Sequence, residues 1–224
     1  MAPENSLVGL EIAARLGCHG VEFDAMLSAD GVPVLIHDET LERTTDGHGR
    51  VDTASFEVLR GLDVGIRHHR AFAGERVPTL EAALATCARL GLWANVEIKP
   101  AGARDEATGA EVARAAAGFR DVLLSSFSVG ALRAAAGAVP ALPRALLLEQ
   151  LVPNWEGLLE EMGVSSIHVA HQALDADTLA ILRSAQIRVA AYTVNTRARA
   201  EQLFSEGIAA VFTDRPDLWL ADEM

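Results

Sequence analysis

One pattern organises most of this chain: an amphipathic helix, a Gly or short polar break, and then a short β-rich run. It recurs in ARLGCHGVEFD, ARLGLWANVEIK, EEMGVSSIHVA, SAQIRVAAYTVN and SEGIAAVFTD. Two further β-rich runs, DVLLSSF and PRALLL, continue the series with helices between them. Helices that alternate with apolar strands indicate a parallel sheet covered by helices.

The pattern predicts seven strands, at residues 21–24, 95–99, 122–127, 144–148, 166–170, 188–194 and 210–214. The expected helices are Glu4–Leu16, Leu80–Leu90, Asp105–Ala117, Val129–Ala136, Trp155–Met162, Asp177–Ala185 and Arg197–Glu206. A (β/α)8 TIM barrel needs eight strands, and each helix follows a strand. Because the first expected element is a helix, we predict such a barrel with its first strand missing upstream of Met1. A doubly wound sheet tolerates seven strands and is the alternative, although no Gly-rich phosphate loop follows a strand.

The repeat lapses in the stretch rich in turn residues and charge that precedes Leu80. This segment is too long for an ordinary strand-to-helix loop, and long excursions of this kind usually have a function. We expect a small insertion at residues 39–78, after the second barrel strand. The chain of 224 residues is otherwise expected to form a single domain over 1–224.

Charge and composition narrow the classes of function. A formal net charge of −12 disfavours a nucleic-acid-binding surface, which needs a basic face. An anionic small-molecule substrate would then need local positive charge, such as a metal or a well-placed Lys. The two cysteines, Cys18 and Cys87, form no CxxC motif, and no signal peptide or membrane-spanning apolar run is visible. These features predict a cytoplasmic protein with no membrane insertion.

Three acidic residues and one lysine are expected on the same face of two strands. Side chains alternate along a strand, which puts Glu22 with Asp24, and Glu97 with Lys99, opposite the apolar residues between them. Burying such charges is costly unless a metal or an anion balances them. Three carboxylates make a hard oxygen site suited to Mg²⁺ or Ca²⁺. The alternative is that these acids merely form ion pairs with Lys99 and nearby Arg.

His37 is expected close to these acids. If Asp30 and Gly31 form a hairpin turn, the run that follows pairs antiparallel with the strand that carries Asp24. This arithmetic places His37 roughly opposite Asp24, within a residue or two. An imidazole at that position can act as a general acid or base.

Three other residues are candidates for functional sites, namely His168, His171 and Tyr192. His168 and His171 suggest a second metal site, but residues three apart on a strand point to opposite faces, which disfavours it. Tyr192 lies at a strand end, where a barrel of this kind places its chemistry. It is predicted to contact substrate, with an interior packing role as the alternative.

The motifs APENS, VEFDAMLSADGVPVLIHDETLERTTDGHG, NVEIKP, LLSSF, YTVN and TDRPD resemble the glycerophosphodiester phosphodiesterase family, with the cytoplasmic bacterial members most similar. The resemblance implies a TIM barrel that hydrolyses glycerophosphodiesters, such as glycerophosphocholine and glycerophosphoethanolamine, to sn-glycerol 3-phosphate and an alcohol. It implies that Glu22, Asp24 and Glu97 hold one divalent metal ion. It also implies that His37 is one of two catalytic histidines and that Lys99 binds the phosphate.

The chain departs from the family pattern at its start. Family members begin with a strand ending in His-Arg-Gly a few residues before the APEN motif, whereas here Met1 precedes Ala2. The favoured interpretation is that the natural protein is longer and active. The alternatives are a truncated or degenerate relative that binds metal or ligand without turnover, and a neighbouring subunit that supplies the strand. Unpaired strand edges also predict self-association. A lipid-directed phosphodiesterase ranks lower, because residues 39–76 show no extended apolar patch.

Overall fold

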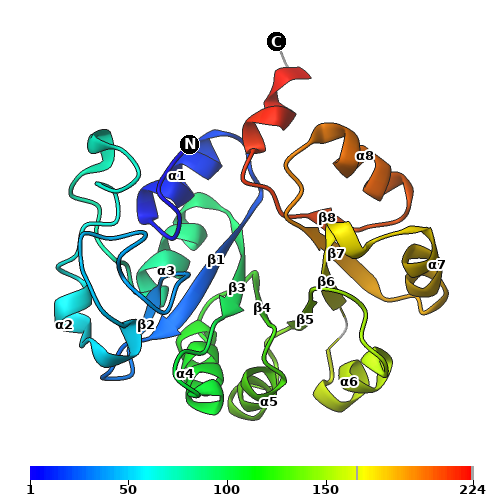
Figure 1. The fold of residues 1–224 in the computed structure, drawn as a ribbon, viewed down its shortest axis with the longest axis horizontal. Coiled ribbons are helices and arrows are strands. Elements are labelled where there is room, and N and C mark those ends of the chain that lie inside the picture. The colour runs from blue at the N-terminus through cyan, green and yellow to red at the C-terminus, as the bar shows by residue number, and fades with distance from the viewer. Residues whose placement is uncertain (165, 223–224) are drawn as a thin grey trace. The chain divides into compact units, whose positions relative to one another are not determined.

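A computed structural model describes residues 1–164 and 166–222 of the chain (Figure 1). The chain divides into two compact units, Met1–Leu142 and Pro143–Met224, which are described separately. The first element is a helix, α1 (Leu7–Arg15), as the sequence predicted. The expectation of one domain over 1–224 with an insertion at 39–78 stays a prediction.

The first unit is built on a sheet whose strands lie in the order β2, β1, β3, β4. These strands are β1 (Gly20–Leu27), β2 (Pro33–Leu35), β3 (Trp93–Ile98) and β4 (Val122–Ser126). The remaining helices of this unit are α2 (Phe56–Leu59), α3 (Leu80–Leu90), α4 (Asp105–Ala116) and α5 (Val129–Ala138), with 3₁₀ turns η1 (Val51–Thr53) and η2 (Arg70–Phe72). β1 pairs parallel with β3, and β3 pairs parallel with β4. The short helix α2 was not predicted.

The predicted hairpin is present, with β2 antiparallel to β1 and Ala25 opposite Leu35. Gly31 in the turn has φ of +83°, a left-handed conformation that glycine adopts without strain. The Ser28 hydroxyl accepts a hydrogen bond from the Val32 backbone N–H and donates one to Asp30. These contacts close the turn and help to set the register of β2 against β1. The register in turn sets the position of His37, which follows β2.

The apolar faces of the central strands lie in the main core of the first unit. Phe23 on β1 and Val96 and Ile98 on β3 are at most 2% exposed, and they cluster with apolar residues of α3 and α4. Burying a side chain of this size typically contributes about 1.5–3 kcal/mol. Because side chains alternate along a strand, this burial forces the acidic residues between them onto the opposite face.

The insertion has a small core of its own. Its apolar residues pack with Met26, Val34 and Ile36 of the hairpin and with Ala101, which follows β3. The insertion residues in this core are Leu41, Val51, Leu59, Val64 and Val77. The segment is therefore packed against the hairpin and the loop after β3.

The second unit repeats the strand–helix alternation. Its strands are β5 (Arg144–Leu148), β6 (Ser166–Ala170), β7 (Arg188–Tyr192) and β8 (Ala210–Val211), each paired parallel with the next. The helices are α6 (Trp155–Met162), α7 (Ala176–Ser184) and α8 (Arg197–Ser205), with 3₁₀ turns η3 (His171–Ala173) and η4 (Pro216–Asp222). All seven predicted strands and all seven predicted helices are thus present, with ends that differ by up to three residues. In the part of the chain that the structure describes, no helix has the length and apolar character needed to cross a membrane.

Two glycines give a direct test of the packing between α4 and α5, which lie next to each other in Figure 1. A Cβ added at Gly109 on α4 would lie 2.1 Å from the backbone oxygen of Ala131 on α5, whereas one added at Gly137 on α5 meets nothing within 4 Å. We expect Gly109→Ala to lower the free energy of unfolding by about 1–3 kcal/mol, because the helices must move apart. Gly137→Ala should raise it by up to about 1 kcal/mol through helix propensity. Urea unfolding of both variants measures the difference, and equal effects would contradict the close packing.

Candidate active site

Three carboxylates converge where β1 and β3 lie side by side. Asp24 and Glu97 are direct partners in the parallel register, and Glu22 lies two residues earlier on β1. Each of the three offers an oxygen, and these oxygens all lie within 4.8 Å of one another. Asp24 is only 6% exposed, whereas Glu22 faces solvent. The convergence predicted from strand alternation is therefore present.

Lys99 supplies positive charge at this cluster. Its Nζ lies 3.2 Å from Asp24 Oδ1 and 3.7 Å from Glu97 Oε1. The ion pairing foreseen as the alternative thus exists, but one ammonium cannot neutralise three carboxylates. Glu97 Oε1 is also buried and accepts no hydrogen bond. The cluster therefore keeps excess negative charge and one unused acceptor, which is what a cation site requires.

Burial and the excess negative charge of the cluster both change the pKa of Glu97. Burial, and to a lesser extent the nearby Asp24 charge, raise its pKa to about 7, against the opposing effects of Lys99 and His37. A carboxylate held this way without a metal retains a proton near neutral pH. A bound divalent cation would favour the ionised form instead.

His37 lies beside the carboxylates, at the end of the hairpin. The Ile36 backbone N–H donates to the Asp24 carbonyl oxygen at 3.2 Å, which places His37 one residue further along than the predicted pairing. That offset is within the stated error of the prediction. Its Nδ1 lies 2.6 Å from Asp38 Oδ1, a contact that the sequence reasoning did not foresee.

An ionic chain continues from Asp38. The Arg43 guanidinium donates to both Asp38 oxygens, at 2.5 and 2.9 Å, and to both Glu4 oxygens, at 2.8 and 2.7 Å. Hydrogen bonds with Arg43, the largest cause, and with His37 together lower the pKa of Asp38 to about 2. Asp38 is therefore ionised at neutral pH.

Asn5 is a second residue that sequence reasoning missed. Its side-chain amide donates to Asp24 Oδ2 at 2.9 Å, and its oxygen accepts from the Asp24 backbone N–H at 2.9 Å. The carboxylate and the strand backbone of Asp24 are thus held by one side chain. The available signal was the position of Asn5 inside the APENS motif, next to the start of α1.

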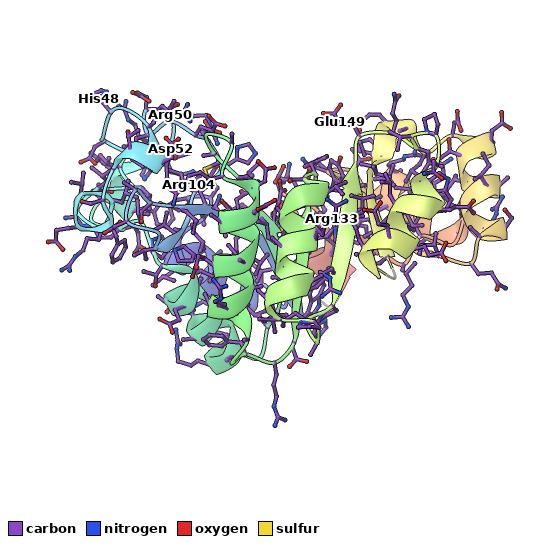
Figure 2. All side chains as sticks on the ribbon, turned by 90° about the horizontal axis from the view of Figure 1, so that it is seen from below. His48, Arg50, Asp52, Arg104, Arg133 and Glu149 are labelled. Atoms are coloured by element: carbon purple, nitrogen blue, oxygen red, sulfur yellow. The ribbon has the colours of Figure 1, made fainter. Side chains whose placement is uncertain are left out.

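The insertion supports the loop that begins at Lys99. Gly102 in this loop has φ of +58°, and an added Cβ would lie 2.2 Å from Asp52 Oδ2. Asp52 is held by Arg50 through bonds of 2.9 and 3.0 Å. Arg104, just after the loop, donates to the Ser28 carbonyl oxygen at 2.8 Å. Figure 2 shows the Arg50, Asp52 and Arg104 side chains gathered in this region of the first unit.

The remaining candidates lie in the second unit. The Tyr192 hydroxyl donates to the Leu148 carbonyl oxygen at 2.9 Å, and its contact with substrate stays a prediction. His168 is buried, packs against Phe212 at 5.0 Å between ring centroids, and has its pKa lowered to about 4 by burial. Among residues 1–164 and 166–222, the carboxylate cluster of the first unit is the only group with metal-site geometry.

Comparison with known proteins gives the family. The profile of the glycerophosphoryl diester phosphodiesterase family matches residues 1–218. The chain belongs to this family of phosphoric diester hydrolases. A glycerophosphodiester phosphodiesterase of Caldanaerobacter subterraneus is 30% identical over 219 residues, which cover 96% of this chain and 90% of that protein.

Solved structures confirm the fold class. A phosphodiesterase of Oleispira antarctica, in complex with the product sn-glycerol-3-phosphate, superposes with a TM-score of 0.94 at 32% identity, covering all of this chain and 92% of the other. A glycerophosphodiester phosphodiesterase of Agrobacterium tumefaciens gives a TM-score of 0.82 at 28% identity, covering 99% of this chain and 94% of the other. The chain therefore has the predicted α/β fold of the (β/α)8-barrel phosphodiesterases.

The raised pKa of Glu97 predicts a pH-dependent stability in the metal-free protein. Because the folded state holds this proton up to about pH 7, while an ordinary Glu releases it near 4.5, the stabilisation present below about pH 4.5 is lost as the pH rises to 7. The loss amounts to at most about 3 kcal/mol. Urea unfolding with chelator, from pH 4.5 to 8, should show this decrease for the wild type and not for Glu97→Gln.

A matched control is Glu160→Gln, on the exposed side of α6. This variant should follow the wild-type pH profile. Adding Mg²⁺ or Ca²⁺ at pH 8 should stabilise the wild type more than Glu97→Gln. Parallel pH profiles for the wild type and Glu97→Gln would show that Glu97 is not the group responsible.

Proposed function

We propose that this protein hydrolyses glycerophosphodiesters, such as glycerophosphocholine and glycerophosphoethanolamine, to sn-glycerol 3-phosphate and an alcohol in a metal-dependent reaction. The observation that carries the proposal is the convergence of three carboxylates beside one lysine and one histidine in a member of this family. The product-bound structural neighbour supports the substrate class.

Glu22, Asp24 and Glu97 would hold one divalent ion, Mg²⁺ or Ca²⁺. The donor set fits, because both ions prefer carboxylate oxygens, and two oxygens on one Ca²⁺ are at most about 5 Å apart. The 4.8 Å spread of the three oxygens lies within that limit, and the unused Glu97 oxygen gives the cation a ready acceptor. When bound, the ion would withdraw charge from the phosphoryl group of the substrate.

The residues of the chain have separate tasks in this proposal. Lys99 binds the phosphoryl oxygens and offsets the negative charge that grows on them in the transition state. In the net reaction an oxygen of water becomes bonded to phosphorus as the phosphorus–oxygen bond to the leaving alcohol breaks, and the attacking hydroxyl loses a proton while the leaving alcohol gains one. His37 carries out one of these two proton transfers as a general base or acid. Tyr192 is also proposed to contact the substrate.

A cytoplasmic location is part of the proposal. The two thiols, Cys18 and Cys87, are free, which suits a reducing compartment. The proposed substrate is a small molecule. Light scattering of the purified chain tests the separate prediction of self-association.

Release of sn-glycerol 3-phosphate from glycerophosphocholine, assayed with Mg²⁺, with Ca²⁺ and with chelator, tests the function. We expect turnover with metal and none with chelator. Glu97→Gln should lower turnover at least 100-fold through loss of a ligand, and His37→Ala about 10²–10⁴-fold through loss of proton transfer. Glu160→Gln should be unchanged.

Two outcomes would contradict the proposal. Undiminished turnover in Glu97→Gln would remove the carboxylate cluster from the chemistry. Metal binding in calorimetry without any product release would instead favour the alternative of a relative that binds metal or ligand without turnover.

A further inference from the structure

We propose that the adjacent residues Glu4 and Asn5 form a two-armed positioning element, which fixes the Asp24 carboxylate with one arm and the His37 imidazole with the other. Neither residue carries a step of the reaction. The structural part of this inference stands by itself, and only its kinetic consequence rests on the proposed function.

The first arm is the Asn5 amide. It makes two hydrogen bonds of 2.9 Å to Asp24, one to the carboxylate and one to the backbone N–H. Rotation of the carboxylate would break one bond, and a shift of the strand would break the other. Such partners behind a metal ligand typically contribute 10–100-fold to metal affinity or activity.

The second arm runs from Glu4 through Arg43 to Asp38. A single guanidinium makes four hydrogen bonds of 2.5–2.9 Å, two to each carboxylate. Exposed ion pairs of this kind usually contribute little to stability. Here the ion pairs orient the side chains, because the planar guanidinium of Arg43 fixes the direction of both carboxylates.

Asp38 then fixes His37. Its ionised oxygen lies 2.6 Å from Nδ1, so this nitrogen carries the proton of the neutral ring. The Nε2 atom is left as the basic nitrogen. Because Asp38 is held by Arg43, and Arg43 by Glu4, the tautomer of His37 depends on a residue 33 positions away in the chain.

Both arms leave from a rigid segment. Ser6 donates from its hydroxyl to the Pro3 carbonyl oxygen at 2.7 Å and accepts from the Gly9 N–H at 3.1 Å, where α1 begins. Asn5 has φ of +52°, a left-handed conformation that Asn tolerates better than most residues. Glu4 and Asn5 therefore lie within a turn, closed by hydrogen bonds, next to the start of α1.

The first test measures the His37 tautomer by ¹⁵N NMR of the metal-free protein, recorded at increasing alkaline pH until the spectrum no longer changes. The wild type should show Nδ1–H. Asp38→Asn and Glu4→Gln should both shift the ring toward a mixture of tautomers. Arg43→Lys should not preserve the wild-type spectrum, because an ammonium cannot bridge two carboxylates in a fork.

The matched control is Glu57→Gln, which breaks the exposed ion pair between Glu57 on α2 and Arg60, the residue after this helix. This variant loses a similar surface contact and should leave the His37 spectrum unchanged. Circular dichroism verifies that each variant is folded.

The second test measures metal affinity by calorimetry. Asn5→Gly keeps the left-handed backbone accessible while removing both bonds to Asp24, and it should weaken metal binding 10–100-fold. In the enzymatic assay, Glu4→Gln should lower kcat about tenfold with KM within about twofold, since it disturbs His37 and not substrate binding.

The outcomes separate the two proposals. An unchanged His37 tautomer in Glu4→Gln and Asp38→Asn, or unchanged metal affinity in Asn5→Gly, would overturn the positioning role. If the spectra and affinities change as expected while the wild type releases no sn-glycerol 3-phosphate, the positioning role holds and the proposed function fails.

Discussion

The pairing of β1 with β3 is the constraint on which the charged cluster depends. The parallel register places Asp24 directly opposite Glu97 and brings Lys99, two residues beyond, within reach of both. Because side chains alternate with a period of two, a slip of one residue would bury the carboxylates and expose Phe23 and Val96. The apolar face beneath the helices therefore holds in place a set of charges that repel one another.

The charges are then oriented by segments outside these two strands. The stretch before α1 reaches Asp24 and Arg43. Asp38 lies immediately before the insertion, and Arg43 lies near its start. The remainder of the insertion packs its own small core against the hairpin and the loop that follows Lys99. The central strands determine which residues meet, and these peripheral segments determine how the side chains point.

Local periodicity was enough to predict much of this arrangement. The alternation of apolar and acidic residues gave the shared face of Glu22, Asp24 and Glu97, and turn chemistry at Gly31 gave the hairpin. The predicted position of His37 was off by one residue. Counting residues around the turn does not show at which residue the strand pairing ends and the loop begins. The contacts of Asn5 with Asp24 and of Glu4 with Arg43 were not predicted. They join side chains 19 and 39 residues apart through irregular backbone, and no sequence period reports such contacts.

The position of the cluster along the chain has a consequence for synthesis. Glu22, Asp24, His37, Glu97 and Lys99 all precede α4, and none belongs to the second unit. Domains tend to fold as units during translation, with the N-terminal part first. The acidic cluster can therefore form once the first unit, which ends at Leu142, has left the ribosome. A nascent chain at that stage would already offer these carboxylates as ligands to a divalent cation, before any strand of the second unit has emerged from the ribosome.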